Sequence, residues 1–509
     1  NNDMWHFFEP TKLATGPALR GLYPSQLVLD GLRTLYEQLA TIKPKLIIAC
    51  GNYALWALTN CTGFSTPSDA EGRRCPSGIE SWRGSMWYAD AAPGALATAK
   101  LMPLIHPAAI MRAWYQRAVT VQDLRVRVPM ALANDWRGDT PLTLAPPTFE
   151  QATLHLRDWL HRCKAGQLRL VCDIETARGL ITCIGFADSP RFAMVIPFIN
   201  KHLDGTFDSF WPEPQERELA TLIRSLLLHP NCLVEGQNFL YDTQYIQHFL
   251  GCTPRLDFDT MLAHHLLFPG TPKGLDYLSS LYCRYHWYWK DDGKEWDTRG
   301  TLESLLAYNA MDCIRTFEVA TILRDLISRM DQSAQWEEEK AKNDLALAMM
   351  NRGIKIDTAH RARLALDLKL ASDALGNWLH SIIPQSHVAP DADVPWFQSP
   401  KQTREFFENE LGFQLPRHKK TGRPTFGKEA LPILRARYPE FVRLFDAIAS
   451  RRSVGVFFNT FIKAPLDPGD RMRCMFNTAG TETFRWSSSE NAFGRGTNLQ
   501  NIPGGTENE

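Results

Sequence analysis

The chain of 509 residues is too long for one ordinary hydrophobic core, and its length predicts two to four domains. Hydrophobic residues make up 44% and charged residues 22% of the sequence, a balance that is typical of globular proteins and excludes a disordered chain. The 56 Lys and Arg residues equal the 56 Asp and Glu residues in number. This balance excludes a net positive charge that would attract the whole chain to nucleic acid or membranes, so any site for a polyanion must come from a local excess of cations.

The cysteines and the apolar stretches indicate the cellular compartment of the protein. None of the eleven cysteines forms a C-x-x-C pair, which excludes a disulfide scaffold and a cysteine zinc knuckle and favours a reducing compartment. The longest apolar stretch, 46–58, is interrupted by Gly51 and Asn52 and is too short to span a bilayer. There is no signal-peptide pattern, and no Met at position 1. We expect a soluble, cytoplasmic protein whose chain begins before residue 1.

The first segment alternates predicted strands and helices. Residues 45–51 (KLIIACG) predict a short apolar strand, and 52–59 predict a helix that begins after Gly51. Residues 101–105 predict a second strand, which ends at His106 and Pro107. This pattern is typical of an α/β layer, in which ligands bind at the carboxyl ends of the strands.

The second segment begins after a predicted connection at 134–147, which is rich in Pro, Gly and Asp. Its pattern predicts a three-stranded meander, a helix, a further strand and then helices, the last with helical spacing of its apolar residues. The predicted strands are 168–174, 180–186, 192–199 and 232–235, and the predicted helices include 213–228 and 303–329.

The third segment is predicted to be mainly helical, at 335–351 and 359–383, before a Pro-rich break at 384–400. Between residues 401 and 465 the sequence has thirteen Lys and Arg against six Asp and Glu. A local excess of cations has two interpretations, a solvated face or a surface that binds polyanions.

Two acids lie in one predicted strand of the second segment. Asp173 and Glu175 are two positions apart in the sequence VCDIE. Because side chains alternate along a strand, both carboxylates are predicted to project from the same face.

Two further motifs each place an acid four residues after a polar residue. Asn238 precedes Asp242 in NFLYD, and Tyr308 precedes Asp312 in YNAMD. Four residues make about one helical turn, so each pair is predicted to share one face of a helix.

Four carboxylates gathered at one site repel one another unless cations neutralise them. Two divalent ions do this, and oxygen ligands suit Mg²⁺ or Mn²⁺. Two such ions roughly 4 Å apart activate a water and stabilise the leaving oxygen of a phosphodiester, and a nearby tyrosine hydroxyl orients that water. Each motif alone also occurs on ordinary strands and helices, but all three in this order favour a metal site.

The three motifs resemble those of the DnaQ-like, DEDD-type 3′–5′ exonucleases, in the subtype with Tyr in the last motif. The resemblance covers about residues 150–330, including 256–270, and implies an RNase H-like fold. It implies that Asn238 helps to place the terminal nucleotide. The family releases nucleoside monophosphates from single-stranded 3′ ends.

The same resemblance implies a role for each of the other motif residues. Asp173, Glu175 and Asp312 would hold two Mg²⁺ or Mn²⁺ ions. Asp242 would assist through water, and Tyr308 would position the nucleophile.

The sequence from 476 to 503 resembles the family A DNA polymerases, those like bacterial DNA polymerase I. The family's T-x-T-G-R-x-S-S-S run is matched at 481–489 with Phe484 where Gly is usual, and N-L-Q-N-I-P is matched fully at 498–503. In the family these runs touch the template–primer duplex. The candidate DNA contacts are Arg485, Asn498 and Gln500.

The basic stretch 401–465 looks like the thumb of the same family, which favours its interpretation as a phosphate-binding surface. In the family the polymerisation aspartates and the cation-bearing fingers helix follow the N-L-Q-N-I-P run, and this sequence stops six residues later at Glu509. We therefore expect that the polymerase active site is not contained in this chain. Either the chain is truncated, or a second chain supplies the remaining palm and fingers.

Residues 42–58 and 104–112 resemble the uracil-DNA glycosylase superfamily, in which His106 would contact substrate. The family's acid-bearing loop is not found in residues 1–20, and the cysteine cluster of its iron–sulfur members is absent. These departures favour an inactive module that holds DNA or docks a partner over an active glycosylase.

The combined expectation is a multidomain α/β protein. It has a glycosylase-like domain (1–137), an RNase H-like exonuclease domain (138–330) and a mainly helical thumb with the start of the palm (331–509). The predicted function is that of the N-terminal portion of a phage-type replicative DNA polymerase with proofreading activity, and its predicted partners are single-stranded 3′ ends, primer–template DNA and replisome proteins. The alternatives are a stand-alone exonuclease of RNA or DNA ends and a non-catalytic scaffold.

Overall fold

The structure is a computed structural model that describes most of the chain, in two compact units. The first unit contains residues up to Leu345 together with Thr478–Arg485, and the second contains Ala346–Asn477 and the residues from Trp486. The described residues are 8–9, 23–59, 78–89, 92–133, 140–202, 204–293, 296, 300–388, 394–418, 422–427 and 429–502. Residues 10–20 and Pro503, on which part of the sequence interpretation depends, lie outside these ranges.

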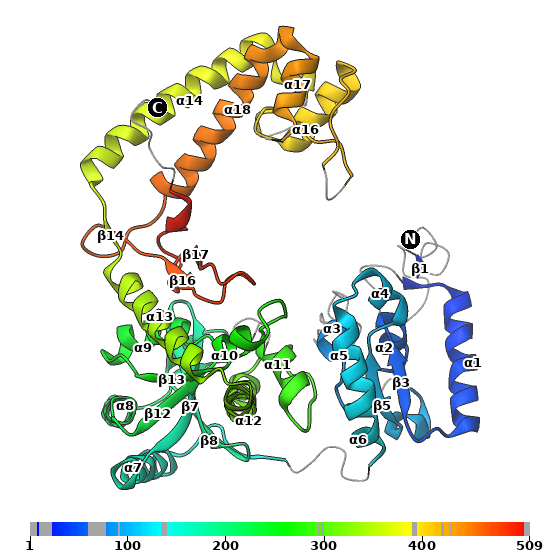
Figure 1. Ribbon diagram of the computed structural model, residues 1–509, viewed down its shortest axis with the longest axis vertical. Helices are drawn as coiled ribbons and strands as arrows, with labels where there is room; N and C mark the ends of the chain where they lie inside the picture. The colour runs from blue at the N-terminus through cyan, green and yellow to red at the C-terminus, as the bar shows by residue number, and fades with distance from the viewer. Residues whose placement is uncertain are drawn as a thin grey trace. The chain divides into compact units, whose positions relative to one another are not determined.

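The N-terminal module of the first unit is a three-stranded sheet of order β3-β5-β4 with helices on both sides (Figure 1). The two predicted strands are confirmed as β3 and β5, which pair in parallel, whereas β4 pairs with β5 in antiparallel fashion. Apolar residues of α1 pack onto buried residues of β3 and β5. The elements are β1 (Phe8–Glu9), β2 (Tyr23–Pro24), α1 (Gln26–Ile42), β3 (Ile47–Cys50), α2 (Asn52–Leu58), α3 (Ile79–Trp82), β4 (Trp87–Tyr88), β5 (Lys100–Leu104), α4 (Pro107–Arg112), α5 (Gln116–Gln122) and α6 (Val128–Leu132).

The rest of the first unit is built on a six-stranded mixed sheet of order β13-β12-β7-β8-β9-β6. The predicted meander is confirmed as β7-β8-β9, and β12 and β13 extend the sheet in parallel beyond β7. The strands are β6 (Leu142–Leu144), β7 (Leu168–Ala177), β8 (Leu180–Ser189), β9 (Phe192–Pro197), β12 (Cys232–Gly236) and β13 (Leu256–Asp259), and a separate hairpin pairs β10 (Ile199–Lys201) with β11 (Phe207–Ser209).

One part of the predicted connection at 134–147 is wrong. Leu142–Leu144 form β6, which pairs in parallel with β9 at the edge of the sheet. A strand of three residues between prolines carries too little alternation to be recognised in the sequence, and its pairing with a distant strand fixes it instead.

Helices cover both faces of this sheet, with α7 and α8 on one side and α12 on the other (Figure 1). The predicted helices at 213–228 and 303–329 are confirmed as α8 and α12. Buried residues of α12 pack onto β7, β8 and β9, so this helix crosses the middle of the sheet. The helices are α7 (Phe149–Ala165), α8 (Glu213–Leu227), α9 (Leu240–Leu250), α10 (Thr260–Leu267), α11 (Leu275–Tyr282) and α12 (Leu302–Arg329).

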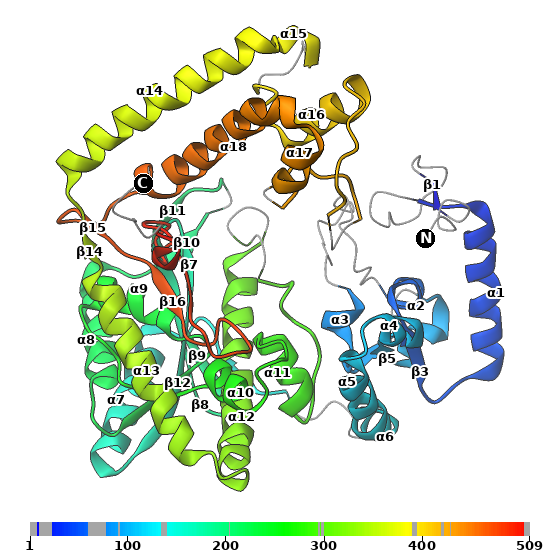
Figure 2. The same ribbon diagram turned by 45° about the horizontal axis from the view of Figure 1, so that its top comes forward.

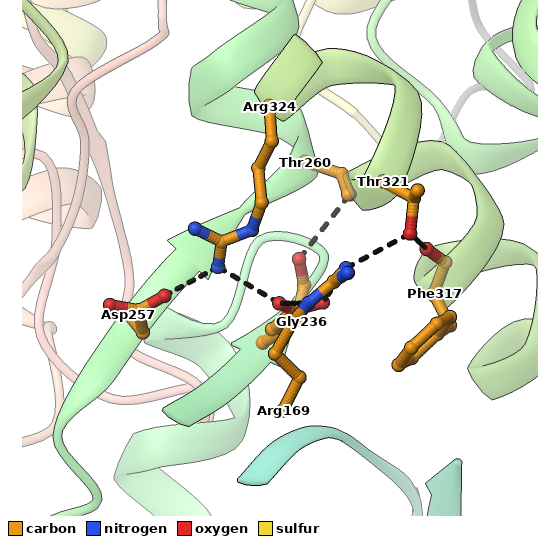
Figure 3. A network of polar contacts seen from close by, with 8 residues as sticks. Arg169, Gly236, Asp257, Thr260, Phe317, Thr321 and Arg324 are labelled. Carbon is orange, nitrogen blue, oxygen red and sulfur yellow. Dashed lines mark hydrogen bonds and ion pairs between the residues drawn. The ribbon is translucent and has the colours of Figure 1, made fainter. Parts of the chain in front are cut away.

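An ionic network around a buried glutamate joins α12 to the sheet (Figure 3). The fully buried Glu235 of β12 accepts hydrogen bonds from Arg169 Nε (2.6 Å) and Arg324 Nη2 (2.8 Å). Arg324 also pairs with Asp257, and Arg169 donates to Thr321 Oγ1 (3.0 Å). The network therefore connects β7, β12, β13 and α12.

A short segment from late in the chain, Thr478–Arg485, belongs to the first unit. Ala479 is buried in a cluster formed by residues of α10, α11 and α12, and the ring of Phe484 lies 4.7 Å from that of His265. Phe484 has a φ of 60°, in the left-handed region that glycine adopts without cost. The polymerase-like run has Phe where the family has Gly, and the structure keeps a glycine-like backbone there at a cost of roughly 1 kcal/mol.

The second unit is mainly helical, as predicted. Figure 2 shows α14 running beside α18, with α16 and α17 near one end of α18. Its core contains a cluster of aromatic residues that includes Trp396, Phe407 and Phe445. The elements are α13 (Ser333–Arg352, shared with the first unit), β14 (Ile354–Lys355), α14 (Thr358–Ile382), α15 (Gln385–Val388), α16 (Pro400–Glu405), α17 (Leu431–Arg437), α18 (Val442–Phe457), β15 (Arg471–Met472), β16 (Met475–Asn477) and β17 (Ser487–Ser489).

Among the described helices, none combines the length and the apolar character that crossing a bilayer requires.

Candidate active site

Three of the four predicted acids lie together between β7 and α12. Asp173 and Glu175 come from β7 and Asp312 from α12, and one carboxylate oxygen of each lies within 4.8 Å of the others. The alternation of β7 therefore places both acids on one face, as predicted. The donor set consists of carboxylate oxygens only, which fits hard divalent cations such as Mg²⁺ or Mn²⁺.

The close approach of α12 to β7 depends on two residues to which the sequence motifs assign no role. Asn309 is buried on α12 and donates from Nδ2 to Asp173 Oδ2 (2.7 Å). Gly185 of β8 pairs with Asp173, and a Cβ on it would lie 2.0 Å from Asn309 Oδ1. Only glycine leaves room for the amide here, so Gly185 lets the helix come close enough to complete the acidic cluster.

Asp242 is buried in the first turn of α9, next to β7. Its Oδ1 accepts the backbone N–H of Ile174 at 3.0 Å, which places this carboxylate beside the strand that carries the first two acids. Asp242 is not one of the three acids that lie within 4.8 Å of one another.

The prediction that Asn238 and Asp242 share a helical face is wrong. Helix α9 begins at Leu240, and Asn238 precedes it with a φ of 56°, in the left-handed region that Asn tolerates well. The buried Asp259 fixes this turn, because its carboxylate accepts the backbone N–H groups of Asn238 (3.2 Å) and Phe239 (2.8 Å).

The electrostatics of the cluster favour bound cations. Burial and the nearby carboxylate of Asp312 raise the pKa of Asp173 to about 8. Burial and then the charges of Asp173 and Asp312 raise the pKa of Glu175 well above its ordinary value, and burial raises that of Asp242. Without a cation Asp173 therefore holds a proton at neutral pH, and a divalent ion would replace it.

The side chains of Trp289 and Lys290 contact Asp312, and the sequence interpretation identified neither of them. Trp289 Nε1 donates to Asp312 Oδ1 (2.6 Å), and Lys290 Nζ donates to Asp312 Oδ2 (2.5 Å) and to the hydroxyl of Tyr308 (2.9 Å). Burial also raises the pKa of Tyr308, with a further contribution from Asp312. The signal in the sequence is weak, because a Trp and a Lys in the loop WYWKDD have no fixed spacing to the acids.

The predicted contacts of the polymerase-like runs lie in both units. Arg485 is exposed at the end of the segment in the first unit, and its N–H donates to Thr481 Oγ1 (3.0 Å). In the second unit, Asn498 Oδ1 accepts from Ser488 Oγ (2.6 Å) and from the backbone of the exposed Gln500 (3.0 Å). The oxygen of Asn498 is thus used within the fold, whereas Arg485 and Gln500 face solvent.

In the N-terminal module, the exposed His106 lies beside Gly51 at the carboxyl ends of β5 and β3. A Cβ on Gly51 would meet His106 Cβ at 3.1 Å, and His106 Nδ1 accepts the N–H of Ala108 (3.1 Å) at the start of α4. Asn52 Oδ1 accepts the N–H of Ile79 at 2.7 Å, so its side chain anchors the start of α3. The structure thus brings residues from 42–58 and from 104–112 together.

We expect His265→Phe to stabilise the chain, and more strongly in acid. His265 is buried, and neither of its ring nitrogens has a hydrogen-bond partner among the described residues. Burial, with a contribution from Lys273, lowers its pKa to about 4. Because the unfolded chain binds this proton near pH 6.5, folding loses stability as the pH falls from 6.5 towards 4.

Thermal unfolding of the two proteins at pH 7.5 and pH 5 tests this expectation. The gain in the free energy of unfolding should be about 1 kcal/mol at pH 7.5, from removal of an unsatisfied buried polar group, and larger at pH 5. His161→Phe, at an exposed position on α7, is the matched control. An equal gain at both pH values would contradict a neutral, buried His265.

Comparison with known proteins finds a family model that matches part of the chain. Residues 201–328 match the family of the 3′–5′ exonuclease domain of DNA polymerase A. The matched range contains Asp242, Tyr308 and Asp312, whereas Asp173 and Glu175 precede it. No curated protein sequence matches the chain.

Among solved structures, the chain is similar to the POL domain of Pol1 from M. smegmatis in complex with DNA primer-template and dNTP. The TM-score is 0.48 at 20% sequence identity, and the similarity covers 69% of this chain. It covers 55% of that protein, so the chain spans only about half the length of this relative.

Proposed function

We propose that the chain is part of an A-type DNA polymerase and that its first unit hydrolyses 3′-terminal nucleotides of DNA. One observation carries this proposal: Asp173, Glu175 and Asp312 converge on one point, and Asp312 lies within the sequence that matches the 3′–5′ exonuclease family. The low exposure of the cluster and the raised pKa values of Asp173 and Glu175 are what a site for two divalent cations needs.

The chain's own residues would hold and orient the reacting groups. Asp173, Glu175 and Asp312 would hold Mg²⁺ or Mn²⁺, which when bound supplies an activated water and neutralises the leaving oxygen. Asn309 holds Asp173 in place, and the hydroxyl of Tyr308 would orient the attacking water. We assign Asn238, at the turn before α9, to the terminal nucleotide.

The second unit offers a basic surface that suits a nucleic-acid backbone. A cavity of about 910 Å³ between α14 and α18 is lined by Lys369, Arg451, Arg452 and Lys463, with Asp373 as its one acid among the described lining residues. Lys and Arg bind phosphates without regard to sequence, so we propose that this unit holds primer–template DNA as a thumb. Proofreading during replication, by a phage-type polymerase, is the role that we propose for the combination.

We propose that the N-terminal module is a glycosylase-like platform that holds DNA or a replisome partner. The support is the position of His106 beside Gly51, at the edge of the sheet where ligands bind in α/β layers. The remaining palm and fingers of the polymerase would lie in sequence beyond Glu509 or in a second chain.

A digestion assay with the full chain tests the proposed exonuclease. A single-stranded oligonucleotide labelled at its 5′ end should shorten stepwise from the 3′ end and release nucleoside monophosphates, with Mg²⁺ or Mn²⁺ but not with EDTA. Absence of shortening with either metal, or release of oligonucleotides instead of monomers, would refute the proposal.

We expect Tyr308→Phe to lower kcat about tenfold to a hundredfold, because the attacking water loses the hydroxyl that orients it. The ring and its packing remain, so the melting temperature should change little. Single-turnover hydrolysis of the same oligonucleotide measures the effect. Tyr282→Phe, which removes a hydroxyl that contacts His264 instead, is the matched control and should keep kcat within about twofold.

A further inference from the structure

We propose that Lys290 is a positioning residue of the exonuclease site and that the N-terminal module sets its place. This inference rests on the proposed function, because it concerns how the same site is kept ready for catalysis. Two sets of contacts carry it: those between Lys290 and the catalytic residues, and those between the N-terminal module and the segment that ends at Lys290.

The first set orients the tyrosine of the site. An ammonium group donates hydrogen bonds and accepts none, so the hydroxyl of Tyr308 must be the acceptor of its 2.9 Å contact with Lys290 Nζ. The single proton of that hydroxyl therefore points away from Lys290, towards the carboxylate of Asp312 or the attacking oxygen. Lys290 Nζ also donates to Asp312 Oδ2 (2.5 Å), so one cation fixes the tyrosine and the metal-binding acid relative to each other.

The second set attaches residues 286–288 to the N-terminal module. The N–H of Met86 donates to the carbonyl of His286 (3.0 Å), and the N–H of Tyr288 donates to the buried hydroxyl of Ser85 (3.1 Å). The ring of Trp82 lies 5.0 Å from that of Tyr288, inside a small buried cluster. Tyr288 is only two residues before Lys290, so these contacts limit where the ammonium can lie.

A buried ion pair anchors the same interface at its other end. Arg83 and Asp123 of the N-terminal module form two hydrogen bonds (2.7 and 2.8 Å), and both side chains are almost fully buried. Arg83 also donates to Ser280 Oγ (2.6 Å), and Arg127 donates to the carbonyls of Ser280 and Arg284 (both 2.6 Å). The two buried arginines together therefore have hydrogen-bond acceptors on both sides of this interface.

The charge of Lys290 has a second consequence that a purely structural residue would not have. A fixed cation beside Asp312 repels a divalent ion that binds the same carboxylate. Lys290 should therefore weaken metal binding while it raises the rate of hydrolysis, and its removal should change the two quantities in opposite directions.

The first experiment compares Lys290→Met and Lys290→Arg with the parent full chain. Lys290→Met should bind Mn²⁺ about threefold to tenfold more tightly in calorimetric titrations, because a like charge is removed. Its kcat should fall about tenfold to a hundredfold with little change in KM. Lys290→Arg, which keeps the charge and the donors, should recover most of kcat. Weaker Mn²⁺ binding by Lys290→Met, or an unchanged kcat, would overturn the assignment.

The second experiment is a double-mutant cycle between the module and Lys290. Ser85→Ala removes the acceptor of the Tyr288 N–H and should lower kcat about threefold to tenfold in the parent. In the Lys290→Met background it should change kcat less than about twofold, because the residue through which it acts is gone. Ser81→Ala, at a half-buried serine of the same module, is the control and should leave kcat unchanged. Equal effects of Ser85→Ala in both backgrounds would show that the module does not act through Lys290.

Failure of this inference is distinguishable from failure of the proposed function. A parent chain that does not shorten DNA with Mg²⁺ or Mn²⁺ refutes the exonuclease itself. An active parent whose rate is indifferent to Lys290→Met and Ser85→Ala refutes only the role of Lys290 and of the N-terminal module.

Discussion

Replacement of both Asp173 and Glu175 by alanine is expected to lower 3′ hydrolysis by about four orders of magnitude or more while it stabilises the metal-free fold. Both carboxylates belong to the three-acid cluster, so their loss removes two of the three groups that would hold the metal ions. The stability gain follows from electrostatics. Burial and the charge of Asp312 raise the pKa of Asp173 to about 8, which means that the ionised carboxylate destabilises the fold. Replacing the carboxylates by alanine removes this repulsion and the cost of burying the charges.

The sign of the pH dependence follows from this raised pKa. A carboxyl that binds its proton more tightly when folded favours the folded state in acid, and that advantage is lost as the pH rises from about 4 to about 8. In EDTA, the melting temperature of the parent should therefore fall between pH 6 and pH 8.5 more than that of the double variant. Added Mg²⁺ should raise the melting temperature of the parent at pH 8.5 and have little effect on the variant.

A matched double variant separates these effects from a general loss of acidic side chains. Asp158→Ala with Glu218→Ala removes two exposed acids, from α7 and α8 of the same unit. This control should keep the parent's activity, pH dependence and response to Mg²⁺. A double variant of the cluster that degrades DNA as fast as the parent would show that the metal assignment is wrong.

The sequence predicted those parts of the fold that depend on local pattern. Alternation and apolar runs located β3, β5, β7, β8, β9 and β12, and helical spacing located α8, α12, α13 and α14, each with ends that differ by a few residues at most. The order of the acids along the chain also predicted their convergence, because Asp173 and Glu175 share one face of a strand and Asp312 lies on the helix that packs over it.

The sequence could not predict features that depend on contacts between distant residues. Gly185 is important for the site only because Asn309 of α12 packs against it. Lys290 is important for the site only because its side chain contacts Asp312, which lies 22 residues later in the sequence. The left-handed turn at Asn238 depends on the carboxylate of Asp259, about twenty residues later in the chain. The four-residue spacing of Asn238 and Asp242 therefore wrongly predicted that both lie on one helix.

The ionic network around Glu235 is another such feature, and its removal should have the largest effect on stability. Glu235→Ala leaves the guanidinium groups of Arg169 and Arg324 without their buried partner. Loss of one member of a buried network costs about 3 to 5 kcal/mol, and the lower end applies here because both arginine side chains are 31% exposed. We expect the free energy of unfolding of the first unit to fall by about 3 kcal/mol in chemical denaturation.

The same change should also reach the active site, because the network holds α12 and α12 carries Tyr308 and Asp312. At temperatures where the variant remains folded, kcat should fall about threefold to tenfold, because small displacements of the reacting groups lower the rate of hydrolysis. Glu218→Ala, which breaks an exposed ion pair with Arg157, is the matched control and should cost less than about 1 kcal/mol. Replacing Arg169, Glu235 and Arg324 together by methionine should restore much of the lost stability, because no fully buried charge is then left unpaired and Asp257, which loses Arg324, is 24% exposed. A triple variant as unstable as Glu235→Ala would mean that the packing around Glu235, rather than its charge, holds the helix on the sheet.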